Sequence, residues 1–94
     1  MKVVFLADAA QDIARLRAFI EPKSPGAAQK AVGAILGGCD SLSMFPGRGK
    51  LRDDGARQLS IPFGASAYIV RYRIDEIAAE IVVSRVKHGR ERQT

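Results

Sequence analysis

The sequence predicts an α+β fold in which a helical hairpin packs on a mostly antiparallel, curved sheet, with the element order β-α-α-β-β-β. Two observations support this fold class. Apolar residues repeat at helical spacing in the first half of the chain, and they alternate with polar residues, as in β-strands, in the second half. A length of 94 residues allows one hydrophobic core, so residues 1–94 are expected to form a single domain.

The first quarter of the chain predicts one short strand and one helix. Residues 2–6 form an apolar run that is long enough for a strand. Asp8 is expected to cap the following helix, because Gln11 stands at the capping-box position behind it. Apolar residues then repeat at spacings of four, three and four, which marks one buried helical face; they are Ala9, Ile13, Leu16 and Ile20. Pro22 ends this helix.

A second helix is expected to begin after Ser24, because Pro25 suits the first helical position. Its predicted apolar face consists of Ala28, Val32, Ile35, Cys39 and Leu42. Gly33, Gly37 and Gly38 each lower helix propensity by about 1 kcal/mol relative to alanine. We therefore expect packing to stabilise this helix, with the glycines allowing the first helix to approach closely.

The second half predicts a three-stranded antiparallel meander. Residues 45–49 form a turn and residues 50–55 a charged loop. The expected strands are 57–62, 67–74 and 79–86, joined by short hairpin connections. In the middle strand Tyr68, Val70, Tyr72 and Ile74 share one face. Arg71 and Arg73 occupy the other. Residues 87–94 are expected to form a basic tail.

Positive charge concentrates in this second half. The net charge is +5, and residues 46–94 contain ten basic and six acidic side chains against five and four in residues 1–45. Such a balance favours polyanions or an acidic protein partner. Arg71 and Arg73, with Arg85 beside them, would project from the face that the helices leave uncovered, where arginines suit phosphates. The alternative is that they are solvated strand residues that resist aggregation.

Cysteine and histidine content excludes several classes of site. With one Cys and one His, the chain allows no intramolecular disulfide and no conventional metal site, and no cofactor is expected. Cys39 is interpreted as a small buried hydrophobe. No run approaches the ~20 apolar residues of a membrane span. The opening apolar run is too short for a signal peptide, and a single cysteine suits the reducing cytoplasm, so a cytoplasmic location without membrane association is expected.

Metal-free RNA cleavage is a further hypothesis, because it needs only a base, a cation and an acid around the phosphate. Arg57, Arg71, His88 and Arg90 are the candidate residues for these roles. The alternative interpretation of His88 is a surface residue at the end of a strand.

Five short motifs, taken in order, resemble the RelE/ParE superfamily of toxins from bacterial type II toxin–antitoxin operons. They are Ala10-Gln11-Asp12-Ile13, Phe45-Pro46-Gly47-Arg48, Ala56-Arg57-Gln58-Leu59, the strand from Tyr68 to Ile74, and Val86-Lys87-His88-Gly89-Arg90. Together they extend across nearly the whole chain. The resemblance implies the β-α-α-β-β-β fold.

The resemblance also implies one of two activities. ParE-like members poison DNA gyrase, and RelE-like members are ribosome-dependent mRNA endonucleases that typically use a tyrosine or histidine near the C-terminus. Here the last tyrosine, Tyr72, is expected in the core, so catalysis of the RelE type would depend on His88. The Pro-Gly-Arg turn and the ending at residues 87–90 favour the ParE branch.

A ParE-like protein has no catalytic residues of its own and is neutralised by a cognate antitoxin. The implied antitoxin is ParD-like, small and acidic, with a DNA-binding N-terminus through which alone the toxin reaches operator DNA. The helical hairpin and an exposed sheet edge are its expected docking places. Expected target- or antitoxin-binding residues are Arg48, Arg57, Arg71, Arg73, Arg85, Lys87, His88 and Arg90. The alternatives are a RelE-like ribosome-dependent endoribonuclease, with the ribosome as target, and a non-toxic module that only binds the antitoxin.

Overall fold

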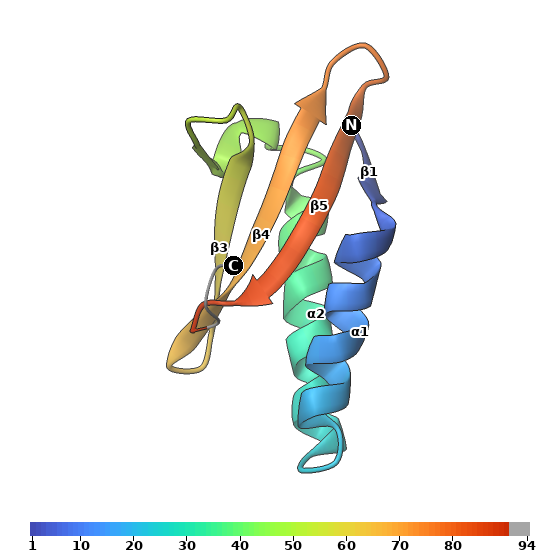
Figure 1. Ribbon diagram of the computed structural model, residues 1–94, viewed down its shortest axis with the longest axis vertical. Coiled ribbons are helices and arrows are strands. Elements are labelled where there is room, and N and C mark those ends of the chain that lie inside the picture. Colours follow the sequence, from blue (N-terminus) through green and yellow to red (C-terminus); the bar gives the residue numbers. More distant parts are fainter. Residues whose placement is uncertain (91–94) are drawn as a thin grey trace.

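The computed structural model describes residues 1–90, in which two helices pack on one face of a five-stranded sheet (Figure 1). The helices are α1 (Ala7–Ile20) and α2 (Pro25–Ser41), and a 3₁₀ turn, η1, covers Pro46–Arg48. The strands are β1 (Lys2–Phe5), β2 (Lys50–Leu51), β3 (Arg57–Phe63), β4 (Ser66–Asp75) and β5 (Glu80–His88). The predicted α+β fold class with a helical hairpin is confirmed.

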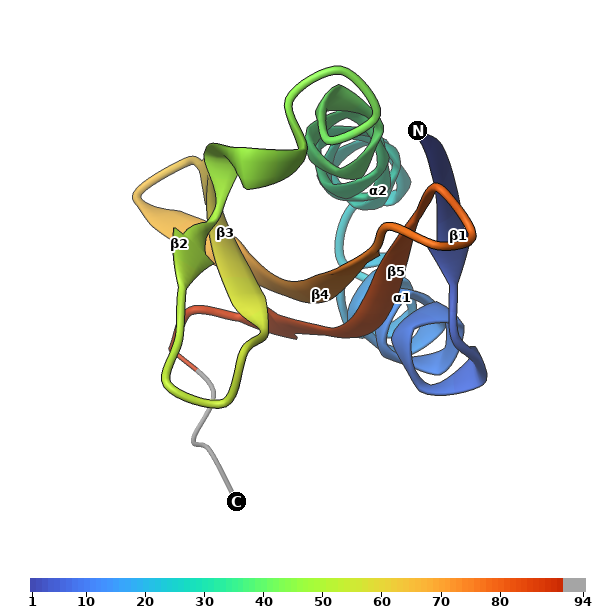
Figure 2. The same cartoon turned by 90° about the horizontal axis from the view of Figure 1, so that it is seen from above.

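The strands lie in the order β1-β5-β4-β3-β2. β1 pairs with β5 in parallel, and the other neighbours are antiparallel. The predicted meander is therefore the centre of a larger mixed sheet, extended by β1 at one edge and β2 at the other. Seen from above, α2 lies over one side of the curved strands and α1 lies beside β5 and β1 (Figure 2). We call the side that faces the helices the inner face and the opposite side the outer face.

The two helix starts differ from each other. α2 begins as predicted, because the Ser24 hydroxyl accepts a hydrogen bond from the Ala27 amide at 3.1 Å and Pro25 occupies the first turn. In α1 the capping position is Leu6, so the predicted cap at Asp8 is wrong. The Leu6 amide donates to the Val83 carbonyl at 2.9 Å. This bond ties the end of β1 directly to the helix, and Asp8 already lies inside the first turn.

The glycines of α2 do not serve contact with α1, and that prediction is wrong. A Cβ at Gly38 would lie 2.3 Å from Cδ1 of Ile61, a residue of β3. Gly33 and Gly37 face open space. Of these three positions only Gly38 needs glycine, because the missing side chain lets α2 approach the sheet.

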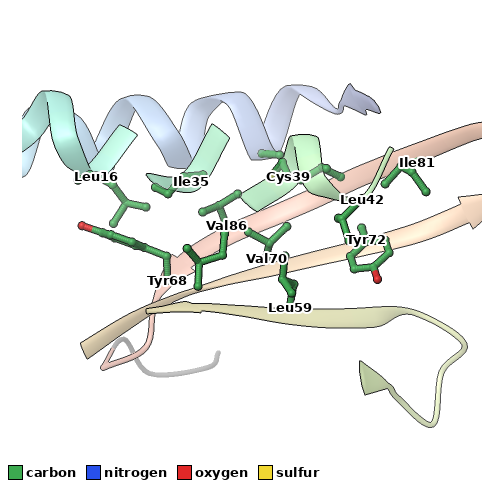
Figure 3. Packing of buried hydrophobic residues seen from close by; sticks show 14 residues of the cluster. Leu16, Ile35, Cys39, Leu42, Leu59, Tyr68, Val70, Tyr72, Ile81 and Val86 are labelled. Carbon is green, nitrogen blue, oxygen red and sulfur yellow. The ribbon is translucent and has the colours of Figure 1, made fainter. Parts of the chain in front are cut away.

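The core fills the space between the helices and the inner face (Figure 3). The predicted alternation of β4 is confirmed: Tyr68, Val70 and Tyr72 are buried, and Ile74 packs against the cluster. From the helices the core receives Ala9, Leu16, Ala31, Ile35, Cys39 and Leu42, and from the other strands Leu59, Ile61, Ile81, Val83 and Val86.

Two boundaries in the second half were predicted wrongly. The charged loop after the turn contains the short strand β2, which pairs with the start of β3. The last strand continues to His88, because β4 is long enough to offer partners: Lys87 lies opposite Ile69, and His88 opposite Tyr68. Both residues thus belong to the sheet rather than to a basic tail. The rest of the predicted tail, residues 91–94, lies outside the described residues.

Candidate functional site

The Pro-Gly-Arg turn is fixed to the sheet by two side chains of the inner face. The Tyr72 hydroxyl accepts a hydrogen bond from the Gly49 amide at 2.8 Å and donates one to the Pro46 carbonyl at 2.7 Å. The Arg57 guanidinium donates to the Gly49 carbonyl at 2.9 Å. Tyr72 is fully buried, as predicted. Arg57 is therefore engaged by backbone oxygens of the turn.

Arg48 lies in the same turn and is exposed. Its guanidinium donates to the Ser41 hydroxyl at 2.7 Å, and that hydroxyl donates in turn to the Gly38 carbonyl at 2.6 Å. This chain of bonds links the turn to the last residues of α2. The candidate binding residue Arg48 thus has a local structural partner as well as an accessible side chain.

Arg71 and Arg73 lie on the outer face, as predicted, and both contact one turn. Arg71 forms an ion pair with the Asp54 carboxylate, and Arg73 donates to the Asp54 carbonyl at 3.2 Å. The other carboxylate oxygen of Asp54 accepts from the Ala56 amide at 3.0 Å. Asp54 therefore joins the turn at residues 52–55 to both arginines.

Arg85 reaches the outer face because β5 contains a bulge. The register shifts between Arg71 and Tyr72, so that Tyr72 lies opposite Val83 while Arg71 lies opposite Arg85. In a regular ladder Ser84 would face Arg71, and strict alternation would place Arg85 on the inner face with Val83. The Ser84 hydroxyl instead donates to the Arg71 carbonyl at 3.2 Å. The bulge thus brings two arginines opposite each other.

The Arg85 guanidinium forms a two-point ion pair with Asp12 of α1, at 2.9 and 3.2 Å. The same carboxylate accepts from the Val86 amide at 2.9 Å. Burial of Asp12 raises its pKa, but the hydrogen bonds from Arg85 and Val86 and the nearby positive charges lower it more, so the pKa lies below 3.8. Hydrogen bonding to Asp12 raises the pKa of Arg85. Asp12 thus accepts a hydrogen bond from the edge of β5 beyond Val83, the last residue of β5 that pairs with β1.

His88 and its neighbours end the sheet. The His88 ring meets the Tyr68 ring edge-on, with 5.5 Å between centroids, and its Nδ1 accepts from the Arg90 amide at 3.2 Å. His88 is the last residue of β5 and is half-buried. Lys87 is on the outer face, opposite Ile69, and Arg90 is exposed beyond the strand.

The four candidate residues for RNA cleavage do not converge on one point, although His88 and Arg90 are in contact. Arg57 pairs with Tyr72 and His88 with Tyr68, so both face inward but lie four positions apart along β4, about 13 Å. Arg71 is on the outer face. Cys39 is fully buried, as predicted, and burial raises the pKa of its thiol to about 11. Within residues 1–90 no three His, Cys, Asp or Glu side chains form a group that could hold a metal ion.

Two contacts of the candidate site escaped the sequence reasoning, those of Asp12 and Asp54. Asp12 is a polar residue three positions after Ala9 and four before Leu16, which places it on the buried side of α1. A carboxylate at that spacing is a signal for a buried ion pair. Asp54 gives no comparable signal, because a charged residue in a turn is ordinary.

No helix within the described range is long and apolar enough to cross a membrane.

Comparison with protein families gives one match over almost the full length. The ParE toxin of the type II toxin–antitoxin system parDE matches residues 3–93. Toxin RelE1 of Caulobacter vibrioides is 35% identical over 85 residues, which cover 90% of this chain and 89% of that protein. Toxin RelE3 of the same organism is 32% identical over 85 residues, covering 90% of each.

Two solved structures resemble the fold. The chromosomal ParDE system from P. aeruginosa aligns with a TM-score of 0.78 at 22% identity, over 94% of this chain and 95% of that chain. The toxin–antitoxin complex RelBE2 from Mycobacterium tuberculosis aligns with a TM-score of 0.65 at 28% identity, over 93% and 95%. The two-helix layer and the five-stranded sheet are thus shared with toxins of both names.

Proposed function

We propose that this chain, which belongs to the ParE toxin family of type II toxin–antitoxin systems, arrests growth by binding DNA gyrase and is neutralised by a cognate antitoxin. The observation that supports this choice is the dispersal of the residues that RNA cleavage would need. His88 and Arg57 are offset by about 13 Å along the strand direction and lie on β5 and β3, on either side of β4, and Arg71 points from the opposite face. General acid–base catalysis requires its groups within hydrogen-bonding reach of one phosphate.

The arginines are also engaged within the protein. Arg57 donates to backbone carbonyls, and Arg71 pairs with Asp54. Such contacts suit a toxin that acts by binding, because they hold cationic side chains in fixed positions on the surface. A nuclease would need these groups directed at one scissile bond.

A groove between α2 and the edge strand β1 supports the antitoxin as partner. Its volume is about 450 Å³, and it is lined by Val3, Phe5, Leu36, Gly37 and Asp40. Phe5 and Leu36 are exposed. An amphipathic segment of an acidic antitoxin would cover these apolar side chains, and the net charge of +5 would attract it. The helical hairpin and the sheet edge are thus the proposed docking places.

A gyrase supercoiling assay with the purified full chain tests the proposal. We expect loss of supercoiling and accumulation of cleaved DNA, both prevented when the toxin is first mixed with an equimolar amount of antitoxin. Unchanged supercoiling at saturating toxin, together with mRNA cut on ribosomes, would instead identify a RelE-like nuclease. In that case His88→Ala should abolish cleavage. A control substitution, Lys30→Gln on the exposed side of α2, should leave cleavage intact.

A growth assay separates both activities from the third alternative. Expression of the chain without antitoxin should arrest growth. Normal growth in cells that contain abundant soluble protein would identify a non-toxic module that only binds its antitoxin, and would contradict the proposal.

A further inference from the structure

Cationic side chains of the outer face form a row across the sheet. Lys50 pairs with Gln58, Gln58 with Arg71, and Arg71 with Arg85, so that these positions align across β2, β3, β4 and β5. Neighbouring strands lie about 4.8 Å apart, and the row therefore extends over about 14 Å. We call Lys50, Arg71 and Arg85 the cationic row.

Two further cations flank this row on the same face. Arg73 follows Arg71 at the next outward position of β4, and Lys87 follows Arg85 at the next outward position of β5. Alternate residues of a strand are about 7 Å apart. α2 lies on the other side of β3 and β4 (Figure 2). The result is a cationic surface on which Lys50, Arg73 and Arg85 are exposed and Arg71 and Lys87 are half-buried.

The opposition of Arg71 and Arg85 is unfavourable by itself, because like charges directly opposite each other repel. Each guanidinium is drawn to a different carboxylate: Arg71 to Asp54, which follows β2, and Arg85 to Asp12, which lies beside β5. The two carboxylates lie toward opposite edges of the sheet. An anion between them would meet two positive charges, of which Arg85 stays paired with Asp12.

The two carboxylates differ in how readily another anion can replace them. The Asp12 side chain is only 7% exposed and has three partners, so it remains in place. The Asp54 side chain is 50% exposed, and water screens its pair with Arg71. A phosphate, with its strong acceptor oxygens, competes well for such an arginine. Asp54 is the internal anion that an external one would displace.

We propose that the outer face binds the phosphate backbone of duplex DNA, through the cationic row together with Arg73 and Lys87, and that Asp54 weakens this binding. The described part of the chain has no aromatic side chain on the outward positions of β3, β4 or β5. Single-stranded nucleic acid is held largely by stacking on aromatic rings. The outward positions hold cations, a hydroxyl, an amide and aliphatic side chains such as Ile69 and Val82, a composition that suits sequence-independent backbone contact.

The opposite end of the outer face limits the footprint. Asp75 and Glu80 pair there, next to the β4–β5 hairpin, and repel phosphates. Duplex DNA would therefore contact the cationic row and its two flanking cations, Arg73 and Lys87, and would not extend to this end of the face. This inference does not rest on gyrase as target, because the surface belongs to the toxin alone.

Fluorescence anisotropy with the full chain and a labelled duplex of about 20 base pairs tests the proposal, at salt concentrations from about 50 to 200 mM. We expect the logarithm of the binding constant to fall with the logarithm of salt with a slope of about −4 to −5, since five cations are involved and each neutralised phosphate contributes about −0.9. Arg73→Gln and Lys87→Gln should each reduce the steepness by about 1.

Asp54→Asn provides the opposite change. The amide oxygen can still accept from the Ala56 amide, but the charge that competes for Arg71 is gone. Affinity for the duplex should rise about fivefold, the effect of removing one unit charge near a phosphate in water. A decrease or no change would contradict the role of Asp54.

Lys30→Gln is the matched control, because it removes the same charge from the exposed side of α2. Its salt slope should equal that of the unaltered protein. An equal loss in this control would show that net charge alone is responsible and would overturn the proposal. So would absence of binding at the lowest salt, or tighter binding of single-stranded DNA or double-stranded RNA. Because gyrase is absent from this assay, its outcome and that of the supercoiling assay are independent.

Discussion

The inner and outer faces of β4 are made from alternating residues of one strand, yet different interactions fix them. On the inner face Tyr68, Val70 and Tyr72 are at most 2% exposed, and the Tyr72 hydroxyl has both a donor and an acceptor as partner. On the outer face Arg71 and Arg73 contact an exposed turn. Burial and satisfied hydrogen bonds fix the inner face, whereas the outer face is fixed by ion pairs that water screens.

This difference separates stability from recognition. Removing a buried contact costs the full desolvation of the group left behind, whereas an exposed ion pair contributes little because water replaces it. Substitutions on the inner face should therefore change the free energy of unfolding. Substitutions on the outer face should change binding and leave that free energy nearly constant. The effects below are ordered by their expected size.

The largest effect is expected at Asp12, which joins the two faces around the edge of β5. Asp12→Ala removes the acceptor of the buried Val86 amide and the partner of Arg85. We expect the free energy of unfolding to fall by about 3 kcal/mol, since an unpaired buried amide and a lost charged hydrogen bond act together. Urea denaturation measures it. Asp12→Asn keeps one acceptor oxygen, so its free energy of unfolding should fall less. Equal losses in the two variants would show that the charge of Asp12 matters more than its hydrogen bond with the Val86 amide.

Acid titration tests the same carboxylate without a substitution. Its pKa is lowered in the folded protein, so the unfolded state binds the proton first as the pH falls. The stabilisation from Asp12 is present above pH 3.8, the ordinary value, and is lost as the pH falls through the lower folded pKa. In Asp12→Asn this part of the pH dependence should disappear. An unaltered acid profile in that variant would contradict the assignment.

The next effect concerns the buried hydroxyl of the inner face. Tyr72→Phe leaves the Gly49 amide without its acceptor and the Pro46 carbonyl without its donor. The expected loss is about 1–3 kcal/mol in the free energy of unfolding, from the desolvated groups that remain. The midpoint of urea denaturation should fall at constant slope. A change below about 0.5 kcal/mol, the range of surface substitutions, would mean that water replaces the hydroxyl.

Alternation along β4 was enough to predict these two faces, because the period of a strand is independent of its neighbours. The bulge was not predictable in this way. It depends on how β4 and β5 align, and it reverses the side on which Arg85 lies relative to strict alternation from Val83. The parallel pairing of β1 with β5 joins residues almost 80 positions apart, for example Lys2 with Glu80. No local pattern records such a pairing.

The candidate site was predicted in its residues but not in their partners. Arg71 and Arg73 were expected on the uncovered face from the alternation of their strand, whereas Arg85 was expected beside them without support from alternation. Their acidic partners come from a turn and from a helix distant in sequence, and only tertiary packing brings them there. The glycines of α2 show the same limit of prediction. Their presence in the sequence predicts weaker helix propensity, but it does not predict that Gly38 is the one packed against Ile61.

A matched pair of glycine substitutions sharpens the comparison within α2. Gly38→Ala places a methyl group 2.3 Å from Cδ1 and 2.7 Å from Cγ1 of Ile61, a nearly buried side chain. The unfolding free energy should fall by about 1–2 kcal/mol through overpacking. Gly33→Ala adds a methyl group in open space and should raise it by about 0.5–1 kcal/mol through helix propensity. Thermal unfolding of both measures the contrast, and equal signs would refute the close approach.

The smallest change in stability is expected on the outer face. Arg73→Gln removes an exposed guanidinium whose contact is a single bond to the Asp54 carbonyl, at 3.2 Å. The glutamine amide can be solvated in its place, so the free energy of unfolding should stay within about 0.5 kcal/mol. The same variant is predicted to lose duplex affinity, which makes it the sharpest test of the two-face distinction. Urea denaturation and anisotropy on one preparation would measure both. A large loss of stability would mean that the outer face, too, is part of what holds the fold.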